Sequence, residues 1–342
     1  GSISSQSSHA LNIENKSNIK TFSNEGSISS DGAGNAIVVN GTITIDNFIN
    51  KGTITRKGNN SSGVAVENKS TVTTFNNEGL IEHTGTSGVG VYTSGSTITN
   101  FTNSGTISGG GYTVRIENNS KINTFLNEVK GVIKGNPVAI AYSTITNFTN
   151  KGTIENTNTT SNSHLYVTAL RLYYSTITNA TNEGLIKGKE GISIQAGTVD
   201  TIINKGTIET TTTSSSVTDS IPGGIAIINA GGTPSNVKTI INEGLIKSQN
   251  YGISYELSNN VETIINKGTI QAQEYGIYIA NTDDAGVDTK LGKIILEPNS
   301  VIESKKDIIN INIKSNKNKK LELSGIEVKK GAIIKSEEGA AI

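Results

Sequence analysis

A short motif, Asn-x-Gly-x-Ile, recurs ten times along this 342-residue chain and constrains its fold more than any other feature. Most intervals between successive motifs are 21 to 27 residues, and one copy carries two extra residues before its glycine. The motifs begin at Asn24, Asn50, Asn77, Asn103, Asn127, Asn150, Asn182, Asn204, Asn242 and Asn266. Self-similarity at such a period indicates a solenoid, in which each repeat packs against its neighbours.

Two apolar columns accompany the motif. Ile or Val stands five residues before each Asn, from Ile19 to Val261, and a third segment alternates apolar and polar residues, as at residues 63–68. This alternation indicates a strand with one buried face. The other column, two residues before the Asn, holds all six Phe of the chain and then smaller residues: Phe22, Phe48, Phe75, Phe101, Phe125, Phe148, Ala180, Ile202, Ile240 and Ile264.

These segments predict an all-β fold. Apolar residues make up only 33% of the chain, a proportion that suggests disorder unless they recur at fixed structural positions, as they do here. No amphipathic helical stretch appears, and the repeat is too short for a strand and a full helix. We therefore predict a parallel β-solenoid of about a dozen rungs, each with three short strands. Equivalent residues of successive rungs are expected to lie ~4.8 Å apart. The Asn column is expected at a corner, with amides bonded from rung to rung.

The repeat fades along the chain. We predict regular rungs over residues 1–285 and degenerate rungs of the same solenoid over residues 286–342, with Pro298 in the Asn column. The sequence stops in mid-rung at Ile342 without a polar cap, and solenoids need capped ends. We therefore expect a fragment of a longer protein.

Charge and composition restrict the partners. The formal net charge is zero, so no general attraction to nucleic acid or to anionic membranes is expected. No apolar run approaches the length that spans a bilayer, so membrane insertion by this chain is not expected. Cysteine is absent, and disulfides therefore play no part in the fold.

The chain offers little for catalysis. His9, His83 and His164 fall in different repeats in or beside predicted loops, and we interpret them as solvated loop residues that form neither a metal site nor a triad. The acidic stretch at residues 281–288 lacks the calcium-binding nonapeptide pattern and is interpreted as a plain loop. No phosphate-binding or nucleophile-elbow motif occurs. We expect no enzyme activity, no cofactor and no metal.

Arginine and tyrosine supply the candidate binding residues. Two of the three Arg are assigned to one outward row of the third segment, and the Tyr gather in particular rungs, where exposed rings can bind sugars or proteins. Alternatively, the Tyr merely cover loops. The candidates are Tyr166, Tyr173, Tyr174, Arg115, Arg171, Tyr251, Tyr275 and Tyr278. The outward row is predicted to run through Asn12, Val38, Ala65, Gly90, Arg115, Ala139, Arg171, Ser193, Ala226, Ser254 and Tyr278.

Insertions and charges add two further features. Residues 156–164 and 210–223, with a companion at 230–236, interrupt the period, and long loops on a rigid scaffold are common binding elements. The residue between Asn and Gly alternates in sign along consecutive rungs, and the residue after the Ile alternates in the opposite phase. The two series are Lys151, Glu183, Lys205, Glu243 and Lys267, and Glu155, Lys187, Glu209, Lys247 and Gln271. Stacked rungs are expected to pair these charges.

The motifs Asn-Lys-Gly-Thr-Ile and Asn-Glu-Gly-Leu-Ile, preceded by Thr-x-x-Phe-x, resemble the repeats of autotransporter (type V secretion) passenger domains. The similarity is greatest to vacuolating-cytotoxin-like passengers and related adhesins, and it covers roughly residues 10–285. The resemblance implies a right-handed parallel β-helix, a cleaved signal peptide and a C-terminal outer-membrane barrel outside this fragment. No catalytic residue of the family's proteases matches a residue of this sequence.

The leading expectation is an adhesin passenger at the bacterial surface or secreted from it. Its partners would be a host-cell surface protein or glycan, or other bacterial cells, with weak self-association as a further option. A toxin-type passenger that binds a receptor and oligomerises is the alternative. A polysaccharide-degrading β-helix enzyme ranks below both.

Overall fold

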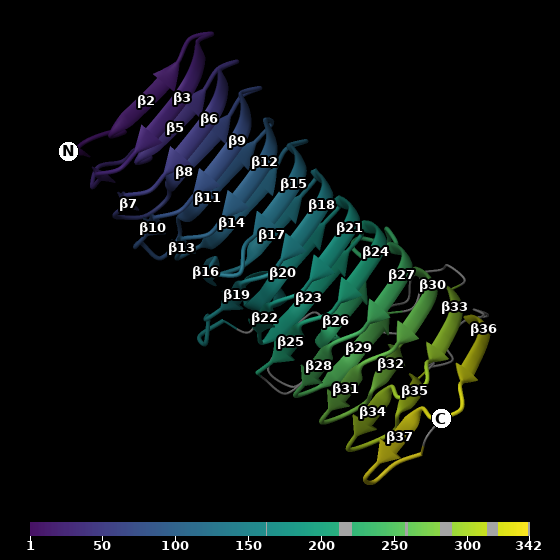
Figure 1. Ribbon diagram of the computed structural model, residues 1–342. Helices are drawn as coiled ribbons and strands as arrows, with labels where there is room; N and C mark the ends of the chain where they lie inside the picture. The colour runs from purple at the N-terminus through teal and green to yellow at the C-terminus, as the bar shows by residue number, and fades with distance from the viewer. Residues whose placement is uncertain (162, 212–220, 257–258, 281–288, 313–320, 341–342) are drawn as a thin grey trace. The chain divides into compact units, whose positions relative to one another are not determined.

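The computed structural model describes residues 1–161, 163–211, 221–256, 259–280, 289–312 and 321–340. The chain divides into two compact units, Gly1–Thr159 and Thr160–Ile342. In each unit the chain passes in turn through three parallel sheets, A, B and C, which repeat from rung to rung (Figure 1). Among the described residues, 13 strands belong to sheet A and 12 each to sheets B and C. The predicted parallel β-helix with about a dozen rungs is confirmed.

In the first unit, sheet A contains β1 (Ser2–Ser5), β4 (Ser27–Ser30), β7 (Thr53–Arg56), β10 (Leu80–His83), β13 (Thr106–Gly109), β16 (Val132–Gly135) and β19 (Thr153–Asn156). Sheet B contains β2 (Leu11–Glu14), β5 (Ile37–Asn40), β8 (Ser62–Glu67), β11 (Val89–Ser94), β14 (Tyr112–Glu117) and β17 (Val138–Ala141). Sheet C contains β3 (Asn18–Asn24), β6 (Thr44–Asn50), β9 (Thr71–Asn77), β12 (Thr97–Asn103), β15 (Lys121–Asn127) and β18 (Thr144–Asn150).

In the second unit, sheet A contains β22 (Leu185–Gly188), β25 (Thr207–Thr210), β28 (Leu245–Ser248), β31 (Thr269–Ala272), β34 (Val301–Ser304) and β37 (Ile333–Ser336). Sheet B contains β20 (Thr168–Tyr173), β23 (Glu190–Gln195), β26 (Gly223–Ile228), β29 (Tyr251–Glu256), β32 (Ile277–Ala280) and β35 (Ile309–Asn312). Sheet C contains β21 (Thr176–Asn182), β24 (Thr198–Asn204), β27 (Asn236–Asn242), β30 (Asn260–Asn266), β33 (Thr289–Leu296) and β36 (Leu321–Val328). A short helix, α1 (His164–Val167), follows the first insertion, where only a loop was expected.

The Phe column fills the core of the first unit. Successive rings from Phe22 to Phe148 stack with centroids 4.6–4.9 Å apart. Phe101 is only 1% exposed. The equivalent Ile202, Ile240 and Ile264 are buried in the second unit. The predicted stacked column is confirmed, and it removes apolar area from water that no single rung could cover.

The Asn column forms a ladder of buried amides, as predicted. Asn24 Nδ2 donates to Asn50 Oδ1 at 2.8 Å, and the series continues to Asn150 with distances of 2.7–2.8 Å. A second series runs from Asn182 to Asn266 at 2.8 Å. The same amides also donate to turn carbonyls, as Asn50 Nδ2 does to Leu80 O at 3.1 Å. The buried polar groups are therefore satisfied by the repeat itself.

The strand register corrects two assignments from the sequence. Tyr92, not Gly90, lies between Ala65 and Arg115 in the outward row of sheet B. The inward position beside it holds the polar Thr93, which hid the alternation and shifted the assignment by two residues.

Pro298 does not occupy the Asn column. Leu296 pairs with Asn266 and is buried, and Pro298 lies in the turn that follows. An apolar side chain replaces the Asn amide at this rung, so the position of the column cannot be found there by searching the sequence for Asn.

Part of the predicted pairing of opposite charges on neighbouring rungs is confirmed by ion pairs. Lys205 pairs with Glu183 at 3.7 Å, and Lys187 with Glu209 at 3.5 Å. Lys267, in the same predicted series, pairs with Glu243 at 3.0 Å. The alternation also continues beyond residue 285, where Lys329 pairs with Glu297 at 2.7 Å and Lys335 with Glu303 at 2.8 Å.

Candidate binding site

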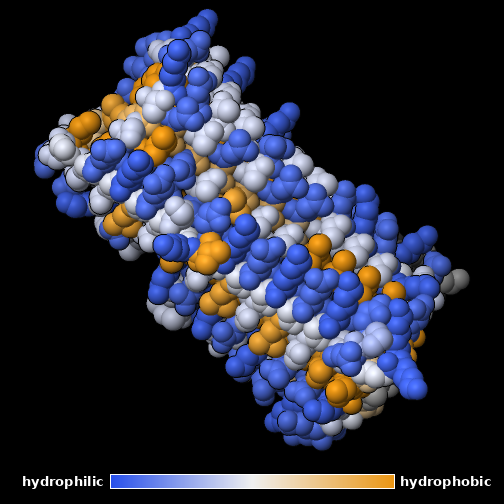
Figure 2. Space-filling model, in the orientation of Figure 1, coloured by the Kyte–Doolittle hydropathy of each residue, from blue (hydrophilic) through white to orange (hydrophobic). Residues whose placement is uncertain are grey.

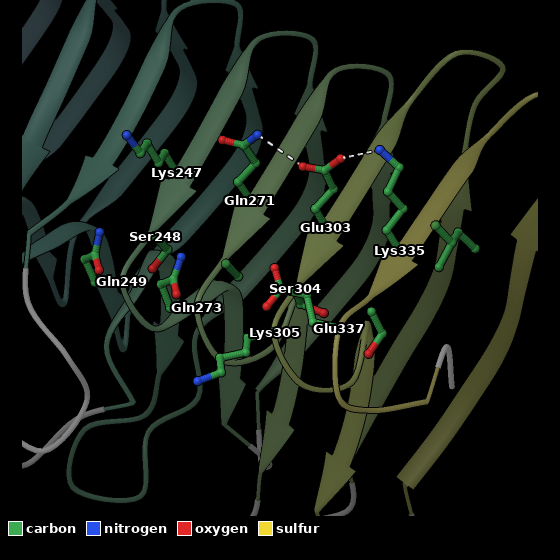
Figure 3. Close-up of a pocket in the computed structure, with 13 residues that line it drawn as sticks. Lys247, Ser248, Gln249, Gln271, Gln273, Glu303, Ser304, Lys305, Lys335 and Glu337 are labelled. Carbon is green, nitrogen blue, oxygen red and sulfur yellow. Dashed lines mark hydrogen bonds and ion pairs between the residues drawn. The ribbon is translucent and has the colours of Figure 1, made fainter.

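A groove of about 800 Å³ runs across four consecutive rungs of the second unit, where the chain turns from sheet A towards sheet B (Figure 3). Its lining comes from the ends of β28, β31, β34 and β37 and from the turns after them. One wall is the row Lys247, Gln271, Glu303 and Lys335. The floor is the row Ser248, Ala272, Ser304 and Ser336 with Ile334. The other wall is the row Gln249, Gln273, Lys305 and Glu337.

Strand geometry explains this arrangement. Successive side chains point to opposite faces, so the two walls project outward and the residue between them turns inward. The inward position suits small hydroxyl residues, because they hydrogen-bond the turn of their own rung or of the rung before it. Ser304 Oγ donates to Lys306 O at 2.8 Å, and Ser336 Oγ donates to the same carbonyl at 2.8 Å. The floor is therefore low and fixed, and the walls are long and polar.

Charges within the groove are partly paired. Glu303 accepts hydrogen bonds from Lys335 Nζ at 2.8 Å and from Gln271 Nε2 at 3.2 Å. The Lys335 ammonium, followed by the Gln271 amide, holds the pKa of Glu303 below its usual range. Glu303 is therefore a stable anion within the wall at neutral pH.

Three of the predicted tyrosines cluster beside the groove. Tyr251 and Tyr275 each follow a wall glutamine by two residues. The ring centre of Tyr278 lies 4.3 Å from that of Tyr251 and 5.1 Å from that of Tyr275. The ring centres of Tyr251 and Tyr275 are 5.7 Å apart. All three rings are half-buried and nearly parallel. We call these residues the tyrosine cluster.

The Lys306 ammonium contacts both the tyrosine cluster and a turn that borders the groove. Lys306 Nζ lies 5.6 Å from the centre of the Tyr275 ring and pairs with Glu274. Burial raises the pKa of Tyr275, so its hydroxyl stays protonated at neutral pH. The Tyr275 ring therefore presents a neutral hydroxyl group.

The structure brings Arg171, Tyr173 and Tyr174 together in a second group. Arg171 is only 8% exposed, its Nη2 donates to Gln195 Oε1 at 3.0 Å, and its guanidinium lies 4.7 Å from the Tyr173 ring centre. Tyr174 OH donates to Ala230 O at 2.8 Å. These side chains pack against the solenoid, as in the interpretation that tyrosines cover loops.

Two other candidates lie apart from these groups. Tyr166 sits on α1 and is 41% exposed. Arg115, in the first unit, pairs through Nη2 with Glu117 Oε2 at 2.6 Å, and Tyr92 OH donates to Glu117 Oε1 at 2.5 Å. Burial, and then the Glu117 hydrogen bond, raise the pKa of Tyr92 to about 12. Sequence reasoning missed Tyr92 and Glu117 because the register was shifted at β11.

The interpretation of His83 as a solvated residue is wrong. His83 is 3% exposed and follows Arg56, which is 1% exposed, in the same inward column. Arg56 donates weakly to Ser30 O at 3.4 Å, and His83 Nδ1 lies 3.1 Å from Gly85 N. Burial, and to a smaller extent the Arg56 charge, lower the pKa of His83. This column takes polar residues because their side chains bond the turn backbone.

The remaining sequence candidates are His9, His164, the acidic stretch and the second insertion. His9 Nδ1 accepts the N–H of Asn35 at 2.9 Å. The His164 side chain, the acidic stretch at residues 281–288 and residues 212–220 of the second insertion lie outside the described residues. Within the ranges that the structure describes, no group of three or more His, Asp or Glu side chains has a metal-binding arrangement. In the same ranges, no helix has the length and hydropathy needed to cross a bilayer.

No protein-family model, curated protein or solved structure matches this chain. We therefore infer the function from the fold, the groove, the tyrosine cluster and the sequence repeats.

Proposed function

We propose that this chain is an adhesive passenger segment of a bacterial protein that is surface-exposed or secreted by the autotransporter route. Its partner is a host-cell surface protein or glycan, or another bacterial cell. The observation that carries the proposal is the polar groove bordered by the tyrosine cluster on a rigid stack of rungs.

The rigidity of the scaffold supports a binding role. Each groove residue lies on a strand end or turn that hydrogen-bonds to the rung before it, as Gln273 N does to Ser248 O at 3.0 Å. The backbone that carries these side chains is already ordered, so it loses little conformational freedom when a partner binds. Tyrosine rings combined with amide groups are common in recognition surfaces.

The exposed surface supports an extracellular display role. Hydrophilic side chains cover most of the visible face, and hydrophobic atoms form small separate patches (Figure 2). Such a surface stays in water without a large apolar partner. The similarity of the repeats to autotransporter passengers, together with the absence of cysteine, agrees with export across membranes in an unfolded form.

Binding of the labelled, purified chain to cultured host cells and to bacterial cells tests the proposal. The double variant Tyr251→Ala/Tyr275→Ala should lose most of the binding, and Tyr166→Ala should retain it. Loss with Tyr166→Ala alone would place the contact on α1. Equal binding by all three proteins, or binding by none, would contradict an adhesive role for the groove region.

Two further measurements test the class of function. Antibodies against this segment should label intact cells of the source bacterium or detect the segment in the culture medium. Release of reducing ends from polysaccharide would contradict a role limited to binding. Vacuolation of treated host cells would favour the toxin-type alternative.

A further inference from the structure

The groove has the dimensions of a site for a chain molecule, because it repeats in one direction. Its walls and floor are built from equivalent residues of four successive rungs, from Lys247 to Lys335. Parallel strands are spaced ~4.8 Å apart, so equivalent polar groups recur at that interval along the groove. A ligand that follows the groove therefore meets polar side chains at every rung.

Two amides in the groove are available to a ligand. Among the described residues, the side-chain amides of Gln249 and Gln273 have no hydrogen-bond partner, whereas Gln271 bonds Glu303. Each free amide supplies a carbonyl acceptor and an NH₂ donor on adjacent rungs. A hydroxyl group is both donor and acceptor, so a ligand rich in hydroxyl groups matches this row.

The charges of the groove do not favour a polyanion. Three lysines and two glutamates line it, which leaves a net charge of +1 (3 − 2). Lys335 is paired with Glu303 at 2.8 Å, and Lys305 is paired with Glu338 at 3.6 Å. Binding of sulfated chains or nucleic acid depends on unpaired positive charge of one sign. The mixed and largely paired charges favour an uncharged ligand.

The spacing between rungs favours a glycan over a peptide as the ligand of the groove. An extended peptide advances about 3.3 Å per residue and alternates its side chains, so it falls out of step with rungs ~4.8 Å apart. A pyranose ring in an extended glycan advances by nearly one rung. Tyr251 and Tyr275 each follow a wall glutamine by two residues, and with Tyr278 they add ring surfaces for the C–H faces of sugars.

We propose that this groove binds an extended, uncharged glycan chain that runs across the rungs, with about one sugar unit per rung. Gln249 and Gln273 hydrogen-bond its hydroxyl groups, and the tyrosine cluster contacts its ring faces. This inference rests on the proposed adhesive function and specifies its ligand.

The test uses the purified chain on an array of neutral, sialylated and sulfated glycans, followed by titration calorimetry with a length series of the best neutral oligosaccharide. Affinity should rise with chain length up to about four sugars, one for each rung of the groove, and then level off. Gln249→Ala/Gln273→Ala should weaken binding about tenfold, the effect expected from losing one or two hydrogen bonds. Lys238→Ala, an exposed change on sheet C, is the matched control and should leave the affinity unchanged.

Several outcomes would overturn the inference. These are binding restricted to charged glycans, affinity that does not depend on chain length, and unchanged affinity of the glutamine variant. Circular dichroism of each variant separates lost binding from lost folding.

Failure of the ligand assignment is distinguishable from failure of the adhesive function. If the glutamine variant loses cell binding but no neutral glycan binds, adhesion stands and the partner is a protein. If neutral glycans bind through the groove but cells do not, the ligand class stands and the adhesive function falls.

Discussion

Replacement of one ring in the Phe column gives the most direct test of the core. Phe101 stacks against Phe75 at 4.9 Å and against Phe125 at 4.6 Å, with interplanar angles of 4° and 8°. Phe101→Ala removes both stacks and leaves a void that cannot close, because the strands on either side are fixed by their ladders. Large-to-small changes of this kind cost about 3–5 kcal/mol, and the rigid surroundings place this one at the upper end.

The column itself supplies the control. Ile occupies it at Ile202, Ile240 and Ile264, so Phe101→Ile keeps an apolar side chain that this position accommodates elsewhere. Its cost should be less than about half that of the alanine variant.

Urea unfolding followed by circular dichroism gives the free energies. Long repeat arrays can lose two-state behaviour, so several probes should be compared before the curves are fitted. A loss below roughly 1 kcal/mol for Phe101→Ala, or equal losses for both variants, would refute the proposed role of the stacked column.

Three other predictions concern polar groups. Asn103→Ala removes two hydrogen bonds of the amide ladder and leaves Asn127 Oδ1 without its donor. The free energy of unfolding in urea should therefore fall by about 1–3 kcal/mol, and an unchanged value would contradict a stabilising role for the ladder. His83 is buried as a neutral ring, and because its pKa is lowered in the folded state, stability should be complete above about pH 6.5 and decrease as the pH falls below it. Melting temperatures of wild type and His83→Gln should show a weaker acid loss in the variant; equal slopes would refute this assignment. Glu183→Lys should slow refolding at low salt more than at high salt, relative to Glu183→Ala, while equilibrium stability falls by only about 0.2–1 kcal/mol. Refolding like wild type at low salt would show that the charge alternation has no role in pairing rungs.

The repeat allowed most of the fold to be predicted from the sequence. The Asn-x-Gly-x-Ile motif and the Phe column define equivalent positions, and stacking places these one above another. Prediction failed where a rung departs from its own pattern. Thr93 stands where the repeat has an apolar residue, and Leu296 stands where it has Asn. Each exception shifted the assignment of its rung by two residues.

The candidate site was only partly accessible to sequence reasoning. Tyr251 and Tyr275 were identified because they precede the same Gly in adjacent rungs, and their rings stack in the structure. Tyr278 was assigned to the outward row of the third segment, and only the structure shows that its ring joins theirs. The groove was missed because its residues are ordinary Gln, Lys and Ser, which acquire meaning only when four turns align. Burial of His83 was missed because spacing alone does not distinguish a loop from an inward corner position.

The alternating charges have a consequence for how a chain of this kind can change in length. Deleting one repeat, such as the rung with Lys205, would preserve the apolar columns and the amide ladder but would place Glu183 beside Glu243. Deleting two neighbouring repeats restores the opposite-sign contact, since the charge pattern has a period of two rungs. The unit that can be duplicated or lost without electrostatic conflict is therefore a pair of rungs, twice the unit that the hydrophobic pattern defines.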